Sequence, residues 1–231
     1  SVIQNGTTNN AGQWGLGLEV LKGANVKLVQ SVIHNNTTFG LLVDQASMEA
    51  EDLIITHTRS QAVDGTLGGG IRLNRGAQLT LNRGLLLDNR DVGIYISGTD
   101  TRGQFTSLVI ENTKSRANGG NRGTGMIIED GAQVSLVQSL ITRSRNGGIL
   151  VEGDGTYLDA NTVTVSKSLG EDESGSGGWG IQVANHAVAA LTNVAIEANR
   201  YFGLAAFGKN TKVVGEGIRI LNTRRQVCYL D

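Results

Sequence analysis

A four-residue pattern recurs along the whole chain: a glycine, an apolar residue, any residue and a second apolar residue. This repeat restricts the possible folds more than any other feature of the sequence. The intervals between successive anchor glycines are 23, 30, 23, 32, 23, 32 and 23 residues. Short and long intervals alternate, so the repeating unit spans two turns and 53 to 55 residues. A period of this kind predicts a solenoid, in which each turn packs on its neighbours. The anchor glycines are Gly17, Gly40, Gly70, Gly93, Gly125, Gly148, Gly180 and Gly203.

Apolar residues after each anchor alternate with period two, which indicates short strands. Ile94 and Ile96 follow Gly93 on one face of such a strand. Further along, the short turns give a second inward pair, such as Leu79 and Leu81, and then a third apolar position, such as Leu86. We therefore predict three short strands per turn, joined by turns.

The predicted fold is all-β: a right-handed, single-stranded parallel β-helix over residues 1–231, with about eight to nine coils. The right hand is expected because parallel β connections are overwhelmingly right-handed. A leucine-rich repeat is the main alternative, since its period also lies between about 20 and 29 residues. It requires a helical return segment, whereas the segments here, such as AQLTLNRGLLLDN, alternate with period two.

One polar position recurs in every coil, shortly after the third apolar position. Stacked polar side chains at a buried turn can form hydrogen bonds along the coil axis. We predict a structural polar ladder of Asn36, Thr58, Asn89, Thr113, Ser144, Ser168, Asn199 and Thr223.

Composition excludes several classes of function. The 20 basic and 21 acidic residues give a net charge of −1, so nucleic acid is not an expected partner. A single cysteine, Cys228, excludes an internal disulfide framework. No run of eighteen apolar residues occurs, so this segment predicts no membrane span.

These repeats, for example GGIRLNRGAQLTLNRGLLLDNRDVGIYISG, resemble the parallel β-helix repeat family of the pectate-lyase-like superfamily. That superfamily includes polysaccharide lyases, polygalacturonases, phage tailspikes and bacterial surface proteins. The resemblance implies an extracellular or cell-surface location, bacterial in type, reached through export signals outside this segment. It also implies a polysaccharide or another surface protein as partner.

Both ends of the sequence lie inside the repeat. SVIQN at residues 1–5 nearly duplicates SVIHN at residues 31–35. We expect a fragment of a longer chain, in which an uncapped end would permit self-association because it exposes strands that can pair.

No catalytic residue is predicted. Acid–base cleavage of a glycoside requires two positioned carboxyl groups. The outward positions of the first strand instead read Glu19, Leu42, Arg72, Tyr95, Ile127, Leu150, Gln182 and Ala205. The first hypothesis is therefore a non-catalytic surface module that is structural, adhesive or glycan-binding. The second, motivated by the superfamily, is a carbohydrate-active enzyme or a part of one.

Extra residues at one corner give the long coils their length, at 59–69, 114–124 and 168–179, with 5–14 as an earlier copy. They should project from one edge about 10 Å apart. In these inserts, Lys114, Arg116 and Arg122 are expected to face the acidic run of the next insert. Salt-linked packing is one interpretation. A structural calcium ion is the other, and no further cofactor is expected. The acidic run is Glu171, Asp172 and Glu173.

Aromatic residues gather at the anchors of two successive coils. Trp179, Tyr201 and Phe202 lie at or beside the residue that precedes the anchor glycine. An aromatic strip can stack on sugar rings, and aromatic residues are favoured at recognition surfaces. Packing of the turn is the alternative interpretation.

Overall fold

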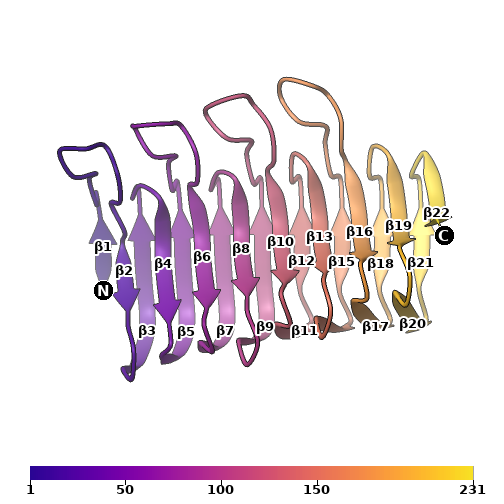
Figure 1. Ribbon diagram of the computed structural model, residues 1–231, viewed down its shortest axis with the longest axis horizontal. Coiled ribbons are helices and arrows are strands. Elements are labelled where there is room, and N and C mark those ends of the chain that lie inside the picture. The colour runs from indigo at the N-terminus through magenta and orange to yellow at the C-terminus, as the bar shows by residue number, and fades with distance from the viewer. Residues whose placement is uncertain (231) are drawn as a thin grey trace.

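The computed structural model describes the backbone of residues 1–230 and the side chains of residues 1–224. Every regular element in this part of the chain is a β-strand, and the strands form two parallel sheets (Figure 1). None of the described residues belongs to a helix long and apolar enough for a membrane crossing. The chain thus folds into a parallel β-helix, as its repeat predicts.

Sheet B has nine strands, one from each successive coil. In sheet order they are β2 (Leu18–Val20), β4 (Phe39–Asp44), β6 (Gly69–Asn74), β8 (Val92–Ser97), β10 (Thr124–Glu129), β13 (Gly147–Glu152), β16 (Trp179–Ala184), β19 (Phe202–Phe207) and β22 (Arg225–Leu230).

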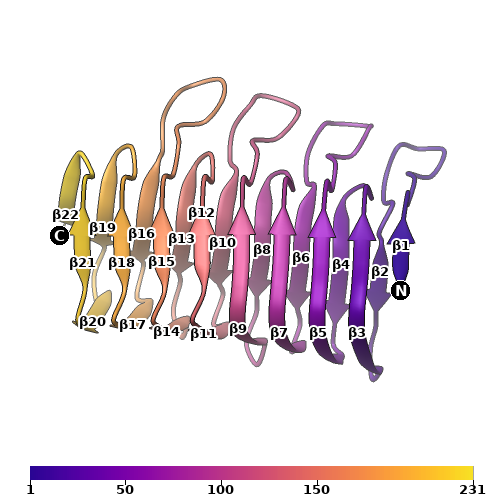
Figure 2. The same cartoon turned by 180° about the vertical axis from the view of Figure 1, so that it is seen from behind.

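Sheet A has thirteen strands. It lies behind sheet B in Figure 1 and faces the viewer in Figure 2. Its main path is β1 (Val2–Gln4), β3 (Asn25–His34), β5 (Ser47–Thr56), β7 (Gln78–Leu87), β9 (Arg102–Glu111), β11 (Gln133–Val137), β14 (Tyr157–Asn161), β17 (Val188–Thr192) and β20 (Lys212–Glu216). A side path from β9 continues through β12 (Leu140–Thr142), β15 (Thr164–Ser166), β18 (Ala195–Glu197) and β21 (Arg219–Leu221).

The core is a set of aliphatic columns between the two sheets. Ile71, Ile94, Met126, Ile149 and Ile181 pair in register on consecutive strands of sheet B, and each is fully buried. Inward residues of sheet A meet them from the other side in the same core cluster. Burial of these columns supplies most of the favourable free energy of folding, because the hydrophobic effect is proportional to the apolar area removed from water.

The anchor glycines form a column of their own, in which successive coils come too close for a side chain. A Cβ atom on Gly70 would lie 2.6 Å from the carbonyl oxygen of Gly93 in the next coil. A Cβ atom on Gly148 would likewise lie 2.5 Å from the carbonyl oxygen of Gly180. Close approach between coils therefore explains why glycine recurs here.

The expectation of three short strands per turn was wrong for the first coils. In β3, β5, β7 and β9 the second and third strands are continuous, with one left-handed residue in the middle. Gln30 (φ 48°) and Asp52 (φ 54°) are two of these residues. Such a residue bends the strand while the parallel pairing continues on both sides. From β11 onward the same bend separates two strands.

Seven of the eight predicted polar-ladder residues are buried, and Thr223 is half-buried. The hydrogen bonds of the asparagines run along the coil axis to backbone groups. Asn89 accepts a bond from Thr58 N through Oδ1 (3.0 Å) and donates through Nδ2 to Ile55 O (3.0 Å). Asn199 makes the same two contacts with the coil before it. Each of these two side chains therefore ties its coil to the preceding one.

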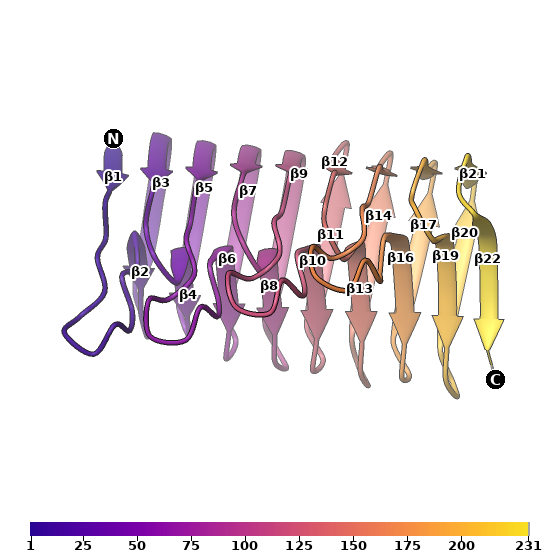
Figure 3. The ribbon, with the colours of Figure 1, turned by 90° about the horizontal axis from the view of Figure 1, so that it is seen from above.

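Four long loops project from one edge of the solenoid (Figures 1 and 3). They are L1 (residues 5–17), L2 (57–68), L3 (112–123) and L4 (167–178), and each joins sheet A to sheet B. Neighbouring loops are joined by backbone hydrogen bonds from Val63 N to Gly12 O (3.2 Å), Asn118 N to Gly65 O (3.2 Å) and Asp172 N to Gly120 O (3.0 Å). We call this assembly the loop row.

Replacing Asn89 with alanine should lower the free energy of unfolding by about 1–3 kcal/mol, because two buried backbone groups lose their partner. Chemical denaturation measures the change. Asn10→Ala, at an exposed position of L1, is the matched control. Equal midpoints for the two variants would contradict the role assigned to Asn89.

Candidate functional site

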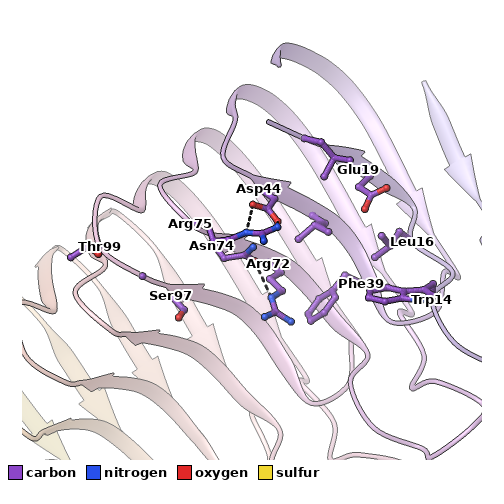
Figure 4. Close-up of a pocket in the computed structure, with 13 residues that line it drawn as sticks. Trp14, Leu16, Glu19, Phe39, Asp44, Arg72, Asn74, Arg75, Ser97 and Thr99 are labelled. Carbon is purple, nitrogen blue, oxygen red and sulfur yellow. Dashed lines mark hydrogen bonds and ion pairs between the residues drawn. The ribbon is translucent and has the colours of Figure 1, made fainter. Parts of the chain in front are cut away.

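A groove of about 800 Å³ crosses the outer face of sheet B over β2, β4, β6 and the end of β8. It runs from Trp14 in L1 to Ser97, the last residue of β8, and to Thr99 just after that strand (Figure 4). Its floor consists of side chains at the outward positions of consecutive strands, such as Leu42 and Arg72. A rigid, stacked floor of this kind suits an extended ligand.

Arg72 lies at the centre of the groove between two aromatic rings. Its guanidinium carbon is 5.5 Å from the centre of the Phe39 ring and 5.2 Å from that of Tyr95. Its Nε donates to Asn74 Oδ1 (3.0 Å). Within the described residues, its terminal nitrogens make no hydrogen bond or ion pair. The cation–π contacts thus orient a guanidinium that still has donors for a ligand.

A second arginine borders the groove as part of an ion pair. Arg75 Nε donates to Asp44 Oδ1 (2.8 Å), and a second nitrogen of the same guanidinium contacts Asp44 Oδ2. Asp44 is buried, whereas the Arg75 side chain is 67% exposed. The pair fixes the arginine and leaves much of its surface accessible.

Trp14 supplies an aromatic surface at one end of the groove (Figure 4). It is 58% exposed, which is unusual for an indole in a well-packed chain. Its backbone N–H donates to Gln61 Oε1 in L2 (3.4 Å), so L1 and L2 are joined at this point. The ring is therefore available to a flat apolar ligand surface.

Tyr95 lies beside the groove and bonds to a carboxylate in the next coil. Its hydroxyl donates to Glu129 Oε1. Burial and, after it, this hydrogen bond raise the pKa of Tyr95 to about 12. The hydroxyl remains protonated at neutral pH and holds Glu129 in place.

The alternation of the repeat predicts the outward face of Arg72 and Tyr95 correctly, but it indicates no role for either residue. The groove has no acidic cluster: its aromatic and basic side chains lie among leucines, with Glu19 and Asp44 as its carboxylates. Trp14 was included only as part of the first insert. The signal that the sequence offered for the groove was a tryptophan in an insert, together with an arginine at an outward position of a strand.

The three aromatic residues singled out from the sequence lie together but are mostly buried. Trp179 and Phe202 are 8% and 5% exposed, and their rings stack with centroids 6.4 Å apart. Trp179 also covers Gly147, where a Cβ atom would overlap the indole. Only Tyr201, at 39%, presents a substantial surface to solvent. The arrangement favours packing over a sugar-binding strip.

The acidic run of L4 is held by hydrogen bonds and an ion pair. Glu171 accepts from Ser174 Oγ (2.8 Å), and Asp172 Oδ1 lies 3.2 Å from Arg145 Nη1. Among the described side chains, no group of three or more His, Cys, Asp or Glu is placed to hold a metal ion. The calcium site that includes Glu173 stays a prediction without support from this geometry.

The expected salt links from the side chains of Lys114, Arg116 and Arg122 to the acidic run are not formed, and Arg122 meets the run only through its backbone N–H, which donates to Glu171 Oε1 (3.0 Å). Lys114 Nζ lies 3.1 Å from Asp88 Oδ1, and Arg116 Nε lies 3.0 Å from the buried Asp91 Oδ1. Arg122 also approaches Asp91, at 3.9 Å. Burial opposes ionisation of Asp88, but the hydrogen bonds from Lys114 and a neighbouring amide outweigh it and lower its pKa. These carboxylates belong to the adjacent coil, which is closer than the next loop.

Ultraviolet difference spectroscopy should show Tyr95 titrating with a pKa of about 12, above the usual value of about 10 for tyrosine. Its contribution to stability should be complete below pH 10, the usual pKa, and should be lost as the pH rises through about 12. Tyr95→Phe should remove the titration step near pH 12. An unchanged titration in that variant would contradict the assignment.

Comparisons with known proteins identify the fold family. The family model described as the right handed beta helix region matches residues 1–166. Neither the curated proteins nor the solved structures contain a significant match to the chain. The matched region covers well over half of the sequence and includes the groove and loops L1 to L3. The chain therefore belongs to the right-handed β-helix family.

Proposed function

We propose that this β-helical module binds a glycan chain in the groove of sheet B, without cleaving it. The observation that carries the proposal is the geometry of Arg72 in the groove floor. The rings of Phe39 and Tyr95 orient its guanidinium, which has N–H donors free for a ligand. Sugars offer hydroxyl or carboxylate oxygens to such donors.

The exposed ring of Trp14 supports the same proposal. A pyranose has one flat face of C–H groups, and aromatic side chains provide a matching apolar surface with a polar edge. Arg75, partly free beside its ion pair, provides further donors at the other side of the groove. The groove thus combines a stacking surface with polar groups that fix orientation.

The proposed setting is the outside of the cell, where a bacterial surface protein would meet polysaccharide. A rigid parallel solenoid suits this role because its floor residues keep a constant spacing of about 4.8 Å. Adhesion or a structural role would follow from the same binding.

Binding is tested by titrating the protein with pectins, alginates and glycosaminoglycans, with and without calcium. Trp14→Ala and Arg72→Ala should each weaken the best ligand about tenfold, through loss of stacking and of charge-assisted hydrogen bonds. Tyr157→Ala and Arg102→Ala are matched controls, since both residues are exposed and lie outside the groove. Equal affinities for the groove variants and the controls would refute the assignment of the site.

Turnover is measured in the same mixtures. We expect no new reducing or unsaturated ends over a long incubation. If such ends were released, and Arg72→Ala abolished their release, the binding proposal would be wrong. The chain would then be a carbohydrate-active enzyme, a class that the superfamily also contains.

A further inference from the structure

An arginine recurs in the coil that follows each of the loops L2, L3 and L4. Arg90, Arg145 and Arg200 are 55 residues apart in sequence. The Cβ atom of each arginine packs against the glycine that ends the preceding loop. If that glycine had a Cβ atom, it would lie only 2.7 or 2.8 Å from the Cβ atom of the arginine. The three side chains therefore occupy equivalent places in the loop row.

The first two arginines contact the loop that comes next in the row. Arg90 Nη1 donates to Ser115 O in L3 (2.9 Å). Arg145 Nη1 pairs with Asp172 Oδ1 in L4 (3.2 Å). In each case an oxygen acceptor on a loop satisfies the guanidinium.

Within the described coils, Arg200 is not followed by another long loop. Where a fifth loop would continue the row, the link between β21 and β22 is only residues 222–224 (Figure 1). The guanidinium of Arg200 lies against the backbone of Gly170 and Gly175 in L4. Among the described residues it forms no ion pair and no hydrogen bond. Among the described residues, its place in the row thus lacks the acceptor that its counterparts have.

A cavity of about 400 Å³ lies at this position. It is lined by Gly175, Ser176 and Gly177 of L4 and by Arg200, Tyr201 and Arg224. Arg224 is exposed and, within the described residues, unpaired. In the described part of the chain these two arginines have no carboxylate partner, which gives this side of L4 a positive charge.

The opposite side of L4 is acidic and faces L3. Glu171 Oε1 accepts from Arg122 N (3.0 Å), and Asp172 N donates to Gly120 O (3.0 Å). Glu173 packs against Gly120. The contact between L3 and L4 thus shows how an acidic loop fits against an arginine and a glycine-rich loop in this fold.

We propose that the open side of L4 binds an acidic peptide loop from a partner protein. The peptide carboxylate occupies the place at Arg200 that Asp172 occupies at Arg145. The peptide backbone meets Gly175 as Asp172 N meets Gly120. This inference is independent of the groove on sheet B.

The probe is a fluorescent cyclic peptide with the sequence of residues 168–178, whose acidic side already fits such a site. Its affinity for the full chain is measured by anisotropy. Arg200→Ala should weaken binding about tenfold or more, as should a peptide carrying E171Q, D172N and E173Q. Rising ionic strength should also weaken it. Arg102→Ala is the matched control, and circular dichroism verifies the fold of each variant.

The proposal would be overturned if the folded chain bound no peptide, or if it bound the acidic and the neutralised peptides with equal affinity. It would also be overturned if Arg200→Ala left the affinity unchanged, or if Arg145→Ala, and not Arg200→Ala, abolished binding. The last would mean that the peptide displaces L4 from its own site. Inorganic phosphate and polyuronate serve as competitors. Displacement of the peptide by either at lower concentration than unlabelled peptide would also overturn it, because the site would then prefer a simple anion or a glycan.

Discussion

Contact between the backbones of consecutive coils at the anchor glycines is the constraint on which the rest of this structure depends. At Gly70 a side chain would collide with the carbonyl oxygen of Gly93 in the next coil. Close approach keeps the parallel strands of both sheets in register through the described coils. The aliphatic columns then stack residue on residue, and the outward positions form straight rows. Both the floor of the groove and the loop row inherit their spacing from this contact.

Regular stacking also determines where charge is satisfied. Long side chains reach the adjacent coil, about 4.8 Å away, more readily than the next long loop at about 10 Å. Lys114 and Arg116 accordingly pair with Asp88 and Asp91 instead of the acidic run of L4. Neighbouring loops are joined by hydrogen bonds from backbone N–H groups, to backbone or side-chain oxygens, and by Arg90 and Arg145, the arginines that follow L2 and L3.

Much of the fold was predictable from the sequence because glycine spacing and alternating apolar residues act through the backbone. Ile94 and Ile96 are inward and fully buried, as their period indicates. The fused strands were not predictable, because the bend is a single left-handed residue that is Gln30 in one coil and Asp52 in the next. No common residue type marks it.

The groove was less predictable than the fold, since it depends on side chains from different coils. Arg72 gains its orientation from Phe39 in the preceding coil and Tyr95 in the following one, and sequence position alone does not reveal these ring contacts. The position of Trp14 depends on the path of L1, whose contact with Gln61 spans 47 residues.

Alternation of short and long coils has a consequence for how such a chain changes length. Loops in the row are separated by a coil that carries only a tight turn, so each loop has about two strand spacings of room. Duplicating or excising one coil would bring two long loops onto neighbouring coils or leave a gap between them. Growth and shrinkage of the protein by recombination should therefore proceed in whole pairs of coils, which makes the pair the heritable module.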